Sequence, residues 1–421
     1  MKDMTAILFR YSDEAGVHQA VSTLKRLGPR LKSIIVLHEW KTPPHVMQGR
    51  IKYLSAISED SAYLLNDIIC QLNTSYVLFF QDTDYLSPTV NPESLTLPRK
   101  KDVLITPYHH RDILINRPIL VRTSVFKKVP FPSQGQLPFK EALFPAWLTN
   151  IKKSQQSRKR DVIRQSKINR SPDTLQKEKI MGKYQLKKGR TCPTLSVIMS
   201  TYNMEKFVEA AVASCLFQNN TFDEILIMDD GSTDHSYQLL QRLAKANGIT
   251  VYRKKNAGKA RALNDLLPHV TSRFILELDA DDWLDPDACD VIKKQLSVLN
   301  DDVSVLYGNL RKWKQSAAGV LFKETTKGTI IKGRDELFTY RLPLGPRIYR
   351  TSILKKEGGF PVIKFGDGRL YEDVSILYRL LGKYPFRYRD FTVYNVREHY
   401  DSITHNNILR WHEFLKSFKY Q

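Results

Sequence analysis

The stretch Leu195–Asn203, LSVIMSTYN, decides the fold, because it is a run of apolar strand-forming residues that passes directly into a polar loop. The same pattern recurs in EILIMDDGS (224–232), ITVYRK (249–254) and RFILELDADDWLDP (273–286), and amphipathic helical stretches separate these runs. Strands that alternate with helices are typical of βαβ units. We therefore predict an α/β fold with a mostly parallel, Rossmann-like sheet.

The first half of the chain repeats this order of strands and helices. Three blocks align the two halves: 7–39 on 198–230 and 61–88 on 259–286 align without a gap, and 121–132 aligns with 349–361. The apolar pattern matches in each block, which indicates a tandem duplication of one fold. Chance similarity between two α/β units is the alternative.

A basic segment separates the two halves. Residues 152–190 hold 14 Lys and Arg residues against three acidic ones, within a chain of net charge +21. Such a segment is typical of a solvated linker, and a basic surface facing anionic lipid or a polyanionic glycan is the alternative. The predicted parts are a domain at 1–150, a basic linker at 151–190, a domain at 191–405 and a C-terminal helix at 406–421.

The composition, with 42% apolar and 10% aromatic residues, describes an ordinary globular protein. No apolar run is long enough to span a membrane, and the four cysteines lack a disulfide or metal-site spacing, so we expect a cytoplasmic protein. Peripheral contact with a membrane, association with a spore surface and a homo-oligomer stay open. The basic segment lacks the interleaved aromatic residues of nucleic-acid-binding modules, so we expect no nucleic-acid partner.

Special residues follow each of the four strands of the second half. They are Thr201, Tyr202 and Asn203 after the first strand, Asp229 and Asp230 after the second, Asn256, Gly258, Lys259 and Arg261 after the third, and Asp279, Ala280, Asp281 and Asp282 after the fourth. Ligands of open parallel sheets bind beyond the carboxyl ends of the strands, so we predict one site formed by these residues.

The residue types at this edge suit a substrate that carries a diphosphate. Asp279 and Asp281 lie two residues apart and can hold a divalent cation, which neutralises a diphosphate leaving group. Asp229 and Asp230 can accept hydrogen bonds from a nucleobase imide or from ribose hydroxyls. Gly258 allows close approach of the backbone to phosphate. For the acidic cluster, a solvated turn followed by a helix cap is the alternative.

Together, the series LSVIMSTYN, ILIMDDGSTD, NAGKARALND and FILELDADDWLDP resembles the family-2 glycosyltransferases over about residues 195–405. The resemblance implies a GT-A fold and a UDP- or dTDP-sugar donor. It assigns the nucleotide base to Asp230 with Tyr202 beside it. It assigns the sugar-diphosphate and a Mn²⁺ or Mg²⁺ ion to Asp279 and Asp281, as the DXD motif. These enzymes invert the anomeric centre, so a carboxylate must take the acceptor proton.

The candidate base lies in GGFPVIKFGDGRLYEDVSILYRL (358–380). Its Glu372 and Asp373 resemble the Glu-Asp motif of the family, whose aspartate is the base, so the resemblance assigns that role to Asp373 with Glu372 beside it. Capping of a helix by these carboxylates is the alternative. Farther along, His399 resembles a metal ligand of some relatives, and a structural histidine is the alternative.

The first half of the chain lacks most of these residues. The replacements are His38 for Asp229, Glu39 for Asp230, Gln81 for Asp279, Thr83 for Asp281, Lys140 for Glu372 and Glu141 for Asp373. We therefore expect the domain at 1–150 to be a catalytically silent copy of the fold. It would pack on the active domain, position a glycan acceptor or drive assembly.

The sequence thus predicts an inverting glycosyltransferase that moves a sugar from a nucleotide-sugar to a hydroxyl of a glycan, a lipid-linked acceptor or a protein. By analogy at the level of the family, the setting is bacterial cell-envelope or spore-surface glycan synthesis. The alternative from another class is a catalytically silent carbohydrate-binding or scaffold protein on the same fold.

Overall fold

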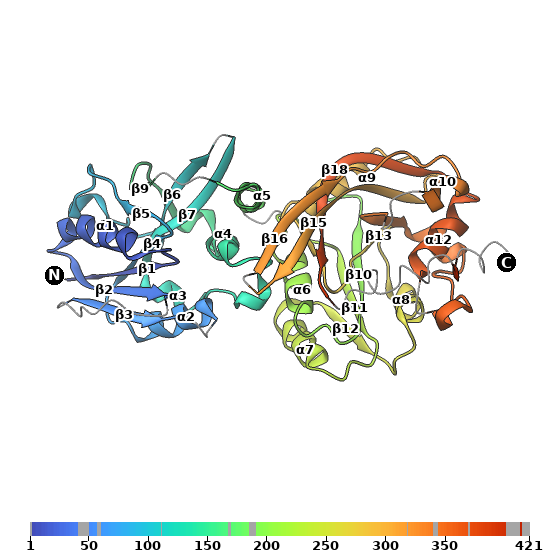
Figure 1. The fold of residues 1–421 in the computed structure, drawn as a ribbon, viewed down its shortest axis with the longest axis horizontal. Helices are drawn as coiled ribbons and strands as arrows, with labels where there is room; N and C mark the ends of the chain where they lie inside the picture. The colour runs from blue at the N-terminus through green and yellow to red at the C-terminus, as the bar shows by residue number, and fades with distance from the viewer. Residues whose placement is uncertain are drawn as a thin grey trace. The chain divides into compact units, whose positions relative to one another are not determined.

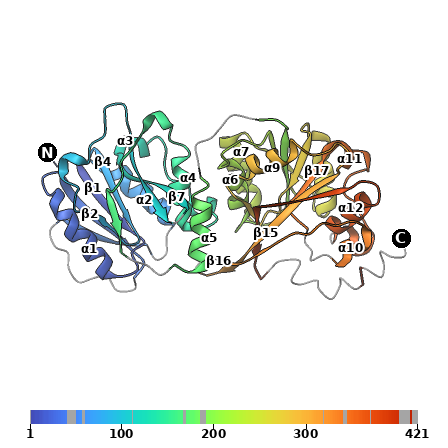
Figure 2. The same ribbon diagram turned by 90° about the horizontal axis from the view of Figure 1, so that it is seen from above.

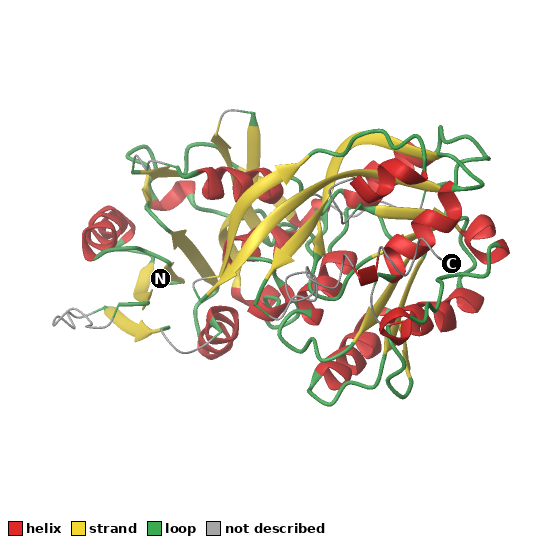
Figure 3. Ribbon diagram, turned by 45° about the vertical axis from the view of Figure 1, so that its right-hand side comes forward, coloured by secondary structure: helices red, strands yellow, loops and turns green. Residues whose placement is uncertain are grey.

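The computed structural model describes residues 2–40, 50–56, 60–110, 112–166, 170–184, 191–317, 319–339, 344–368, 371–400 and 413–414. The chain divides into two compact units, Met1–Leu186 and Lys187–Gln421, which we call unit 1 and unit 2. Strands and helices are interspersed in both units (Figure 1, Figure 3).

Unit 1 contains a seven-stranded sheet with the order β3-β2-β1-β4-β7-β6-β8. Its strands are β1 (Met4–Phe9), β2 (Leu31–His38), β3 (Ile51–Ser55), β4 (Tyr76–Gln81), β6 (Val103–His110), β7 (Ile113–Arg122) and β8 (Gln156–Arg158). β3, β2, β1 and β4 run parallel, and β7 pairs with β4 in the antiparallel direction. A second, two-stranded sheet joins β5 (Asp84–Leu86) and β9 (Ile163–Gln165). The helices are α1 (Glu14–Leu24), α2 (Ser61–Gln71), α3 (Thr123–Phe126), α4 (Leu143–Leu148) and α5 (Pro172–Met181).

Unit 2 contains a nine-stranded sheet with the order β12-β11-β10-β13-β17-β15-β18-β14, in which β16 also pairs with β15. Its strands are β10 (Leu195–Thr201), β11 (Glu224–Asp229), β12 (Thr250–Arg253), β13 (Phe274–Glu277), β14 (Trp283–Leu284), β15 (Val305–Ser316), β16 (Gly319–Thr326), β17 (Arg347–Arg350) and β18 (Phe386–Glu398). β12, β11, β10 and β13 run parallel, whereas β17 is antiparallel to β13 and to β15.

Helices cover both faces of the unit 2 sheet (Figure 2). They are α6 (Val208–Leu216), α7 (Ser236–Asn247), α8 (Lys259–Leu266), α9 (Ala288–Leu296), α10 (Arg334–Thr339), α11 (Thr351–Lys356) and α12 (Glu372–Leu381). The alternation of side chains along β10 builds both cores, because Val197 and Met199 pack with α6, α7 and α9, whereas Ile198 packs with α8, α10, α11 and α12. The predicted α/β class with parallel-rich sheets is confirmed.

The two sheets have the same strand order through their first six strands, since β3-β2-β1-β4-β7-β6 corresponds to β12-β11-β10-β13-β17-β15. Their registers agree as well. The pair of Ile7 with Phe79 in unit 1 is equivalent to the pair of Ile198 with Glu277 in unit 2. In the same way, Tyr76 with Arg122 is equivalent to Phe274 with Arg350. The aligned sequence blocks match the same residues, so the order and the register are those that a tandem duplication would produce.

The prediction of a basic linker at 151–190 is wrong for its described residues, which fold as part of unit 1. β8 extends the sheet beside β6, β9 pairs with β5, and α5 packs near β7. Val162 and Ile180 are buried and hold the segment in unit 1. Its many Lys and Arg side chains give it the composition of a solvated linker, although its backbone is part of the fold. Residues 167–169 and 185–190 lie outside the described residues.

Of the C-terminal helix predicted at 406–421, only Glu413 and Phe414 belong to the described residues. Phe414 is buried, and its ring stacks on that of Tyr371 with 4.5 Å between centroids. Tyr371 directly precedes α12. Across the described parts of the chain, no helix is both long enough and apolar enough to cross a membrane.

Candidate active site

The loops that follow β10, β11, β12 and β13 meet at one edge of the unit 2 sheet, because these strands run parallel. Gly231 lets two of the loops touch. Its φ is 76°, and a Cβ there would lie 2.7 Å from the backbone nitrogen of Asn256. Asp230 then holds the second loop, since its carboxylate accepts hydrogen bonds from the N–H groups of Ala257 (2.9 Å) and Gly258 (2.7 Å). Asp230, the predicted nucleotide-base residue, therefore also shapes the site.

Two buried oxygens at this edge have no hydrogen-bond partner within the described part of the chain, namely Thr201 Oγ1 and Asp229 Oδ1. Thr201 and Asp229 pair across β10 and β11, so they stand on neighbouring strand ends. The other oxygen of Asp229 lies 3.1 Å from Arg253 Nε. Leaving such an oxygen unsatisfied costs about 1–3 kcal/mol. The pair therefore suits a ligand with N–H or O–H donors, such as a nucleobase imide or a ribose.

The two residues that follow Thr201 have different surroundings. Tyr202 is 46% exposed, so its ring can stack on a planar group. Asn203 instead joins the loops after β10 and β11. Its N–H donates to Ser232 Oγ (3.0 Å), and its Oδ1 accepts from the N–H of Thr233 (2.8 Å). The side-chain oxygen of Asn203 is therefore used within the fold.

The remaining predicted donor residues also lie at this edge. Ala280 is buried, and Asn256 is part-buried in the loop held by Asp230. Arg261 donates from Nη1 to the carbonyl oxygens of Ala257 (2.9 Å) and Asp367 (3.0 Å). Arg261 therefore joins α8 to the loop that precedes α12, a contact that the sequence did not predict.

A set of ionic side chains gathers at the end of β13, and we call it the buried charge cluster. Its members are Lys259, Glu277, Asp279, Arg347, Glu372 and Asp373. Lys259 Nζ lies 2.6 Å from Asp279 Oδ1, 3.1 Å from Glu277 Oε1 and 3.2 Å from Glu372 Oε1. One ammonium group thus connects the predicted DXD motif with the predicted base motif.

Arg347 makes a second connection between the same two motifs. Its guanidinium binds Glu277 through two hydrogen bonds of 2.9 Å. It also lies 3.2 Å from Asp279 Oδ2 and 3.5 Å from Asp373 Oδ2. The structure therefore brings together Asp279, Glu372 and Asp373, which are far apart in the sequence.

The cluster sets the ionisation of its carboxylates. Although burial opposes ionisation, Lys259 and Arg347 hold the pKa of Asp279 well below its usual range. Burial raises the pKa of Glu372 to about 7, against the opposing effect of Lys259. The side chain of Asp373 is 22% exposed and that of Glu372 10%, so Asp373 is the more accessible carboxylate. It also stands in the first turn of α12, where the helix dipole favours a negative charge.

The predicted metal ligands fall into two groups. Asp281 Oδ2 lies 3.0 Å from His399 Nε2, whereas Asp279 is bound to Lys259 and Arg347. Within the described ranges, no three His, Cys, Asp or Glu side chains gather closely enough to hold a metal ion by themselves. Asp281 and His399 fit an ion whose other ligands are water or diphosphate oxygens. The contacts of Asp279 do not favour it as a direct metal ligand.

Sequence reasoning missed Glu277 and Arg347. Glu277 is a lone carboxylate in the apolar strand FILE, and its counterpart in the first half is Phe79. Extension of the third block toward the N-terminus by two residues, at its offset of 228, places Ile119 opposite Arg347. Comparison of the two repeats could therefore have identified both residues, because they are charged in unit 2 where unit 1 has apolar residues.

The corresponding edge of unit 1 is filled by its own side chains. Arg10, which stands in the place of Thr201, binds Asp82 at 2.9 Å. Asp84 is fully buried and pairs with Arg117. Burial raises the pKa of Asp84 to about 6, although Arg117 opposes the shift. These ion pairs use both carboxylates of the stretch QDTD (81–84) within the fold.

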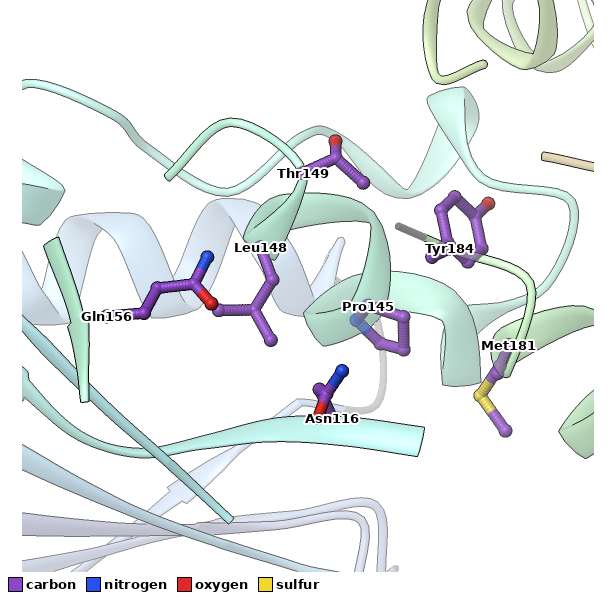
Figure 4. Close-up of a pocket in the computed structure, with 7 residues that line it drawn as sticks. All are labelled: Asn116, Pro145, Leu148, Thr149, Gln156, Met181 and Tyr184. Atoms are coloured by element: carbon purple, nitrogen blue, oxygen red, sulfur yellow. The ribbon is translucent and has the colours of Figure 1, made fainter. Parts of the chain in front are cut away.

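Unit 1 also contains a small pocket of about 40 Å³, whose lining includes none of Arg10, Asp82 and Asp84 (Figure 4). Pro145 and Leu148 of α4 line it together with Gln156 of β8 and Met181 of α5. A pocket of this size holds water rather than a sugar nucleotide. It therefore does not compete with unit 2 as the candidate site.

Several known proteins are similar to part of this chain. Glycosyltransferase GlyA of Streptococcus pneumoniae is 23% identical over 220 residues, which are 48% of this chain and 31% of that protein. The putative teichuronic acid biosynthesis glycosyltransferase TuaG of Bacillus subtilis is 36% identical over 110 residues, 25% of this chain and 42% of that protein. The chain thus spans less than half the length of either relative.

Two solved structures align with about half of the chain. S. aureus TarS in complex with UDP is 21% identical with a TM-score of 0.36, covering 49% of this chain and 60% of that chain. The mannosyltransferase PcManGT from Pyrobaculum calidifontis, in complex with GDP-Man and Mn²⁺, is 16% identical with a TM-score of 0.36, covering 52% and 61%.

The model of the family "Glycosyl transferase family 2" matches residues 196–357. This segment contains β10 to β13, the strand ends described above and Arg347. The match agrees with the resemblance of the strand-end motifs. Unit 2 of this chain therefore contains a family 2 glycosyltransferase domain.

Proposed function

We propose that unit 2 is an inverting glycosyltransferase that moves a sugar from a UDP- or dTDP-sugar to an acceptor hydroxyl. One observation carries the proposal. The edge with the unsatisfied oxygens of Thr201 and Asp229, which suit a nucleotide, is connected through the buried charge cluster to the accessible carboxylate of Asp373. A bound donor and a base held in one site are what a single displacement requires.

The reaction follows from these positions. The acceptor oxygen attacks the anomeric carbon on the face opposite the diphosphate, and Asp373 takes the proton from that oxygen. The new glycosidic bond forms while the bond from the anomeric carbon to the diphosphate oxygen breaks, and its electron pair leaves on the diphosphate. One displacement inverts the anomeric centre. Lys259, which is part-exposed beside Asp279, places positive charge on the donor side.

A divalent ion, Mn²⁺ or Mg²⁺, would be held by Asp281 and His399 together with the donor. When bound, it neutralises the negative charge that the diphosphate gains as it departs. Asp279 would stay with Lys259 and Arg347 and orient the donor from the side of the cluster.

The relatives support the setting of this activity. TuaG is named for teichuronic acid biosynthesis, and GlyA is named as a glycosyltransferase. We infer that this chain acts in bacterial cell-envelope or spore-surface glycan synthesis, on a glycan, a lipid-linked acceptor or a protein. A carbohydrate-binding or scaffold protein without turnover is the alternative that the donor experiment below decides.

We further propose that unit 1 is a catalytically silent copy of the same fold. Arg10 and Asp82 pair where unit 2 has Thr201 and Ala280, and Glu141 pairs with Lys177 where unit 2 has its base. Phe79 takes the place of Glu277 and packs on aromatic rings of unit 1. The donor and base positions of unit 1 are therefore used for its own packing.

A donor screen by thermal unfolding tests the proposed function. The protein is heated with UDP-GlcNAc, UDP-glucose, dTDP-glucose or GDP-Man, each with and without Mn²⁺. A ligand at 100 times its Kd stabilises the folded state by about 2.7 kcal/mol. We expect one nucleotide class to raise the unfolding midpoint, and Mn²⁺ to raise it further.

Asp281→Asn should remove the Mn²⁺ increment in this screen, because it removes one of the two proposed ligands. Asp301→Asn is the matched control, since Asp301 is an exposed carboxylate that pairs with Arg273, just before the start of β13 and at the opposite end of this strand from the site. The scaffold alternative would be correct if no donor shifted the midpoint and none were hydrolysed or transferred.

Thr201→Val should weaken UDP binding about tenfold, which corresponds to one lost hydrogen bond of about 1.4 kcal/mol. Its midpoint should stay the same or rise, because a methyl group replaces a buried, unsatisfied hydroxyl. Thr351→Val is the control, since Thr351 Oγ1 is also buried and unsatisfied in the described chain but lies at the start of α11. Calorimetric titration with UDP measures the affinity of both variants. If Thr201→Val bound UDP as tightly as the parent protein, Thr201 would not belong to the donor site.

Asp373→Asn should lower transfer about 10²–10⁴-fold while UDP binding stays unchanged, since a general base contributes a factor of this size. Glu372→Gln is the companion variant and should retain most of the activity, because Glu372 is the less accessible carboxylate. Initial rates with the donor found in the screen measure both. The assignment of the base is wrong if Asp373→Asn keeps near-normal transfer.

Titration of the full chain with UDP should give one binding site per chain. Asp230→Ala should remove that site, because its carboxylate holds the donor-side loop. Glu39→Ala changes the equivalent residue of unit 1 and should leave both affinity and stoichiometry unchanged. Two sites of comparable affinity would contradict the silent role of unit 1.

A further inference from the structure

Arg347 occupies the first position of β17, opposite Glu277 of β13 in the antiparallel register. Its side chain is 6% exposed. The guanidinium therefore lies beneath the site. It contacts both Asp279, which follows β13, and Asp373 of α12.

Each of the five N–H groups of Arg347 has an acceptor. Nε and Nη2 donate to the two oxygens of Glu277 at 2.9 Å each. Nη2 also donates to Asp279 Oδ2 (3.2 Å), and Nη1 lies 3.5 Å from both Asp373 Oδ2 and the carbonyl oxygen of Leu344. The two bonds to Glu277 fix the plane of the guanidinium, so the directions toward Asp279 and Asp373 are fixed as well.

Glu277 is suited to hold Arg347 because its carboxylate is closed off from solvent. It is 1% exposed, and its oxygens also accept from Tyr349 Oη (3.0 Å) and lie 3.1 Å from Lys259 Nζ. Although burial opposes ionisation, Arg347 and Lys259 lower the pKa of Glu277. The carboxylate thus keeps its charge and its place beneath the site.

Unit 1 shows that the fold does not need this ion pair. At the equivalent positions of β4 and β7 it carries Phe79 and Ile119, with the same strand order and register. Buried ion pairs are often no more stabilising than apolar residues of similar volume. The charged pair in unit 2 therefore calls for a reason other than stability.

We propose that Arg347 is a positioning residue, fixed by Glu277, which holds the base carboxylate Asp373 in register with the donor-side carboxylate Asp279. The inference rests on the proposed function and extends it to residues that do not touch the reacting atoms. Asp373 Oδ1 accepts from the N–H of Val374 (2.8 Å), and Arg347 holds the other oxygen. Together the two contacts set the direction in which the base faces the acceptor.

The test is Arg347→Lys, which keeps the charge but cannot bind three carboxylates in fixed directions. Displacement of a reacting group by about 1 Å costs about 10²-fold in rate. We expect kcat for the donor found in the screen to fall about 10²-fold. The donor KM and the Kd for UDP should change less than about threefold, because the nucleotide-side contacts and Lys259 remain.

Arg350→Lys is the matched control on the same strand. Arg350 is also buried, but it donates to the carbonyl oxygens of Val303 (3.0 Å) and Asn300 (2.6 Å), outside the site. Unit 1 keeps an arginine at the equivalent position, Arg122, as expected for a role in the fold. We expect Arg350→Lys to lower the unfolding midpoint while kcat stays within about twofold. An equal loss of kcat in both variants would overturn the proposal.

A double variant distinguishes failure of this inference from failure of the proposed function. In the Asp373→Asn background, Arg347→Lys should cause no further loss, because Arg347 acts through Asp373. If Asp373→Asn is inactive but Arg347→Lys keeps kcat within threefold, only the role of Arg347 is wrong. If Asp373→Asn keeps transfer, the assigned base is wrong.

A second variant, which takes its residues from unit 1, distinguishes loss of transfer from failure to fold. Glu277→Phe combined with Arg347→Ile introduces the apolar pair found there, so it should fold, with an unfolding midpoint below that of the parent because Asp279 and Asp373 lose a partner. We expect it to lose transfer by at least as much as Arg347→Lys. Transfer at the level of the parent protein would show that the ion pair positions nothing.

Discussion

The parallel pairing of β10 with β11 and β13 is the constraint on which the rest of unit 2 depends. Parallel strands end at the same edge, so this pairing places the polar residues that follow each strand side by side. Thr201 and Asp229 become neighbours in this way, and Asp230 can then hold the loop before α8. The contact between these two loops also requires glycine at position 231, because any side chain there would push them apart.

The buried charge cluster determines how the site is organised at this edge. It combines four carboxylates with two cations. Glu277 and Arg347 are its buried members, and buried charges are tolerated only when they are paired. Lys259 and Arg347 each contact three carboxylates, so neither can move without leaving a charge unpaired. The raised pKa of Glu372 relieves part of the excess negative charge. The cluster is thus held by contacts within unit 2 alone, and charges held in place by the protein are what the proposed electrostatic catalysis requires.

The sequence predicted the strands, their order along the chain and the polar strand ends, because these depend on local periodicity and on motifs. It did not predict the partnership of Glu277 with Arg347, which are 70 residues apart and meet only through the pairing of β13 with β17. The segment 151–190 was misinterpreted for a related reason. Its composition is dominated by charge, whereas its placement depends on a few buried residues such as Val162 and Ile180. Such contacts depend on tertiary packing that composition does not reveal.

Comparison of the two units distinguishes the residues that this fold requires from those that the site requires. Both keep an arginine at the position of Arg350 and Arg122, and in each unit it binds backbone carbonyl oxygens at the sheet end. They differ three residues earlier, where unit 2 has Arg347 opposite Glu277 and unit 1 has apolar side chains. Because the same strand pairing forms with either solution, strand pairing cannot be the reason for the charges. Their value must lie in what they hold in place, and the groups that they hold are the carboxylates of the proposed donor and base positions.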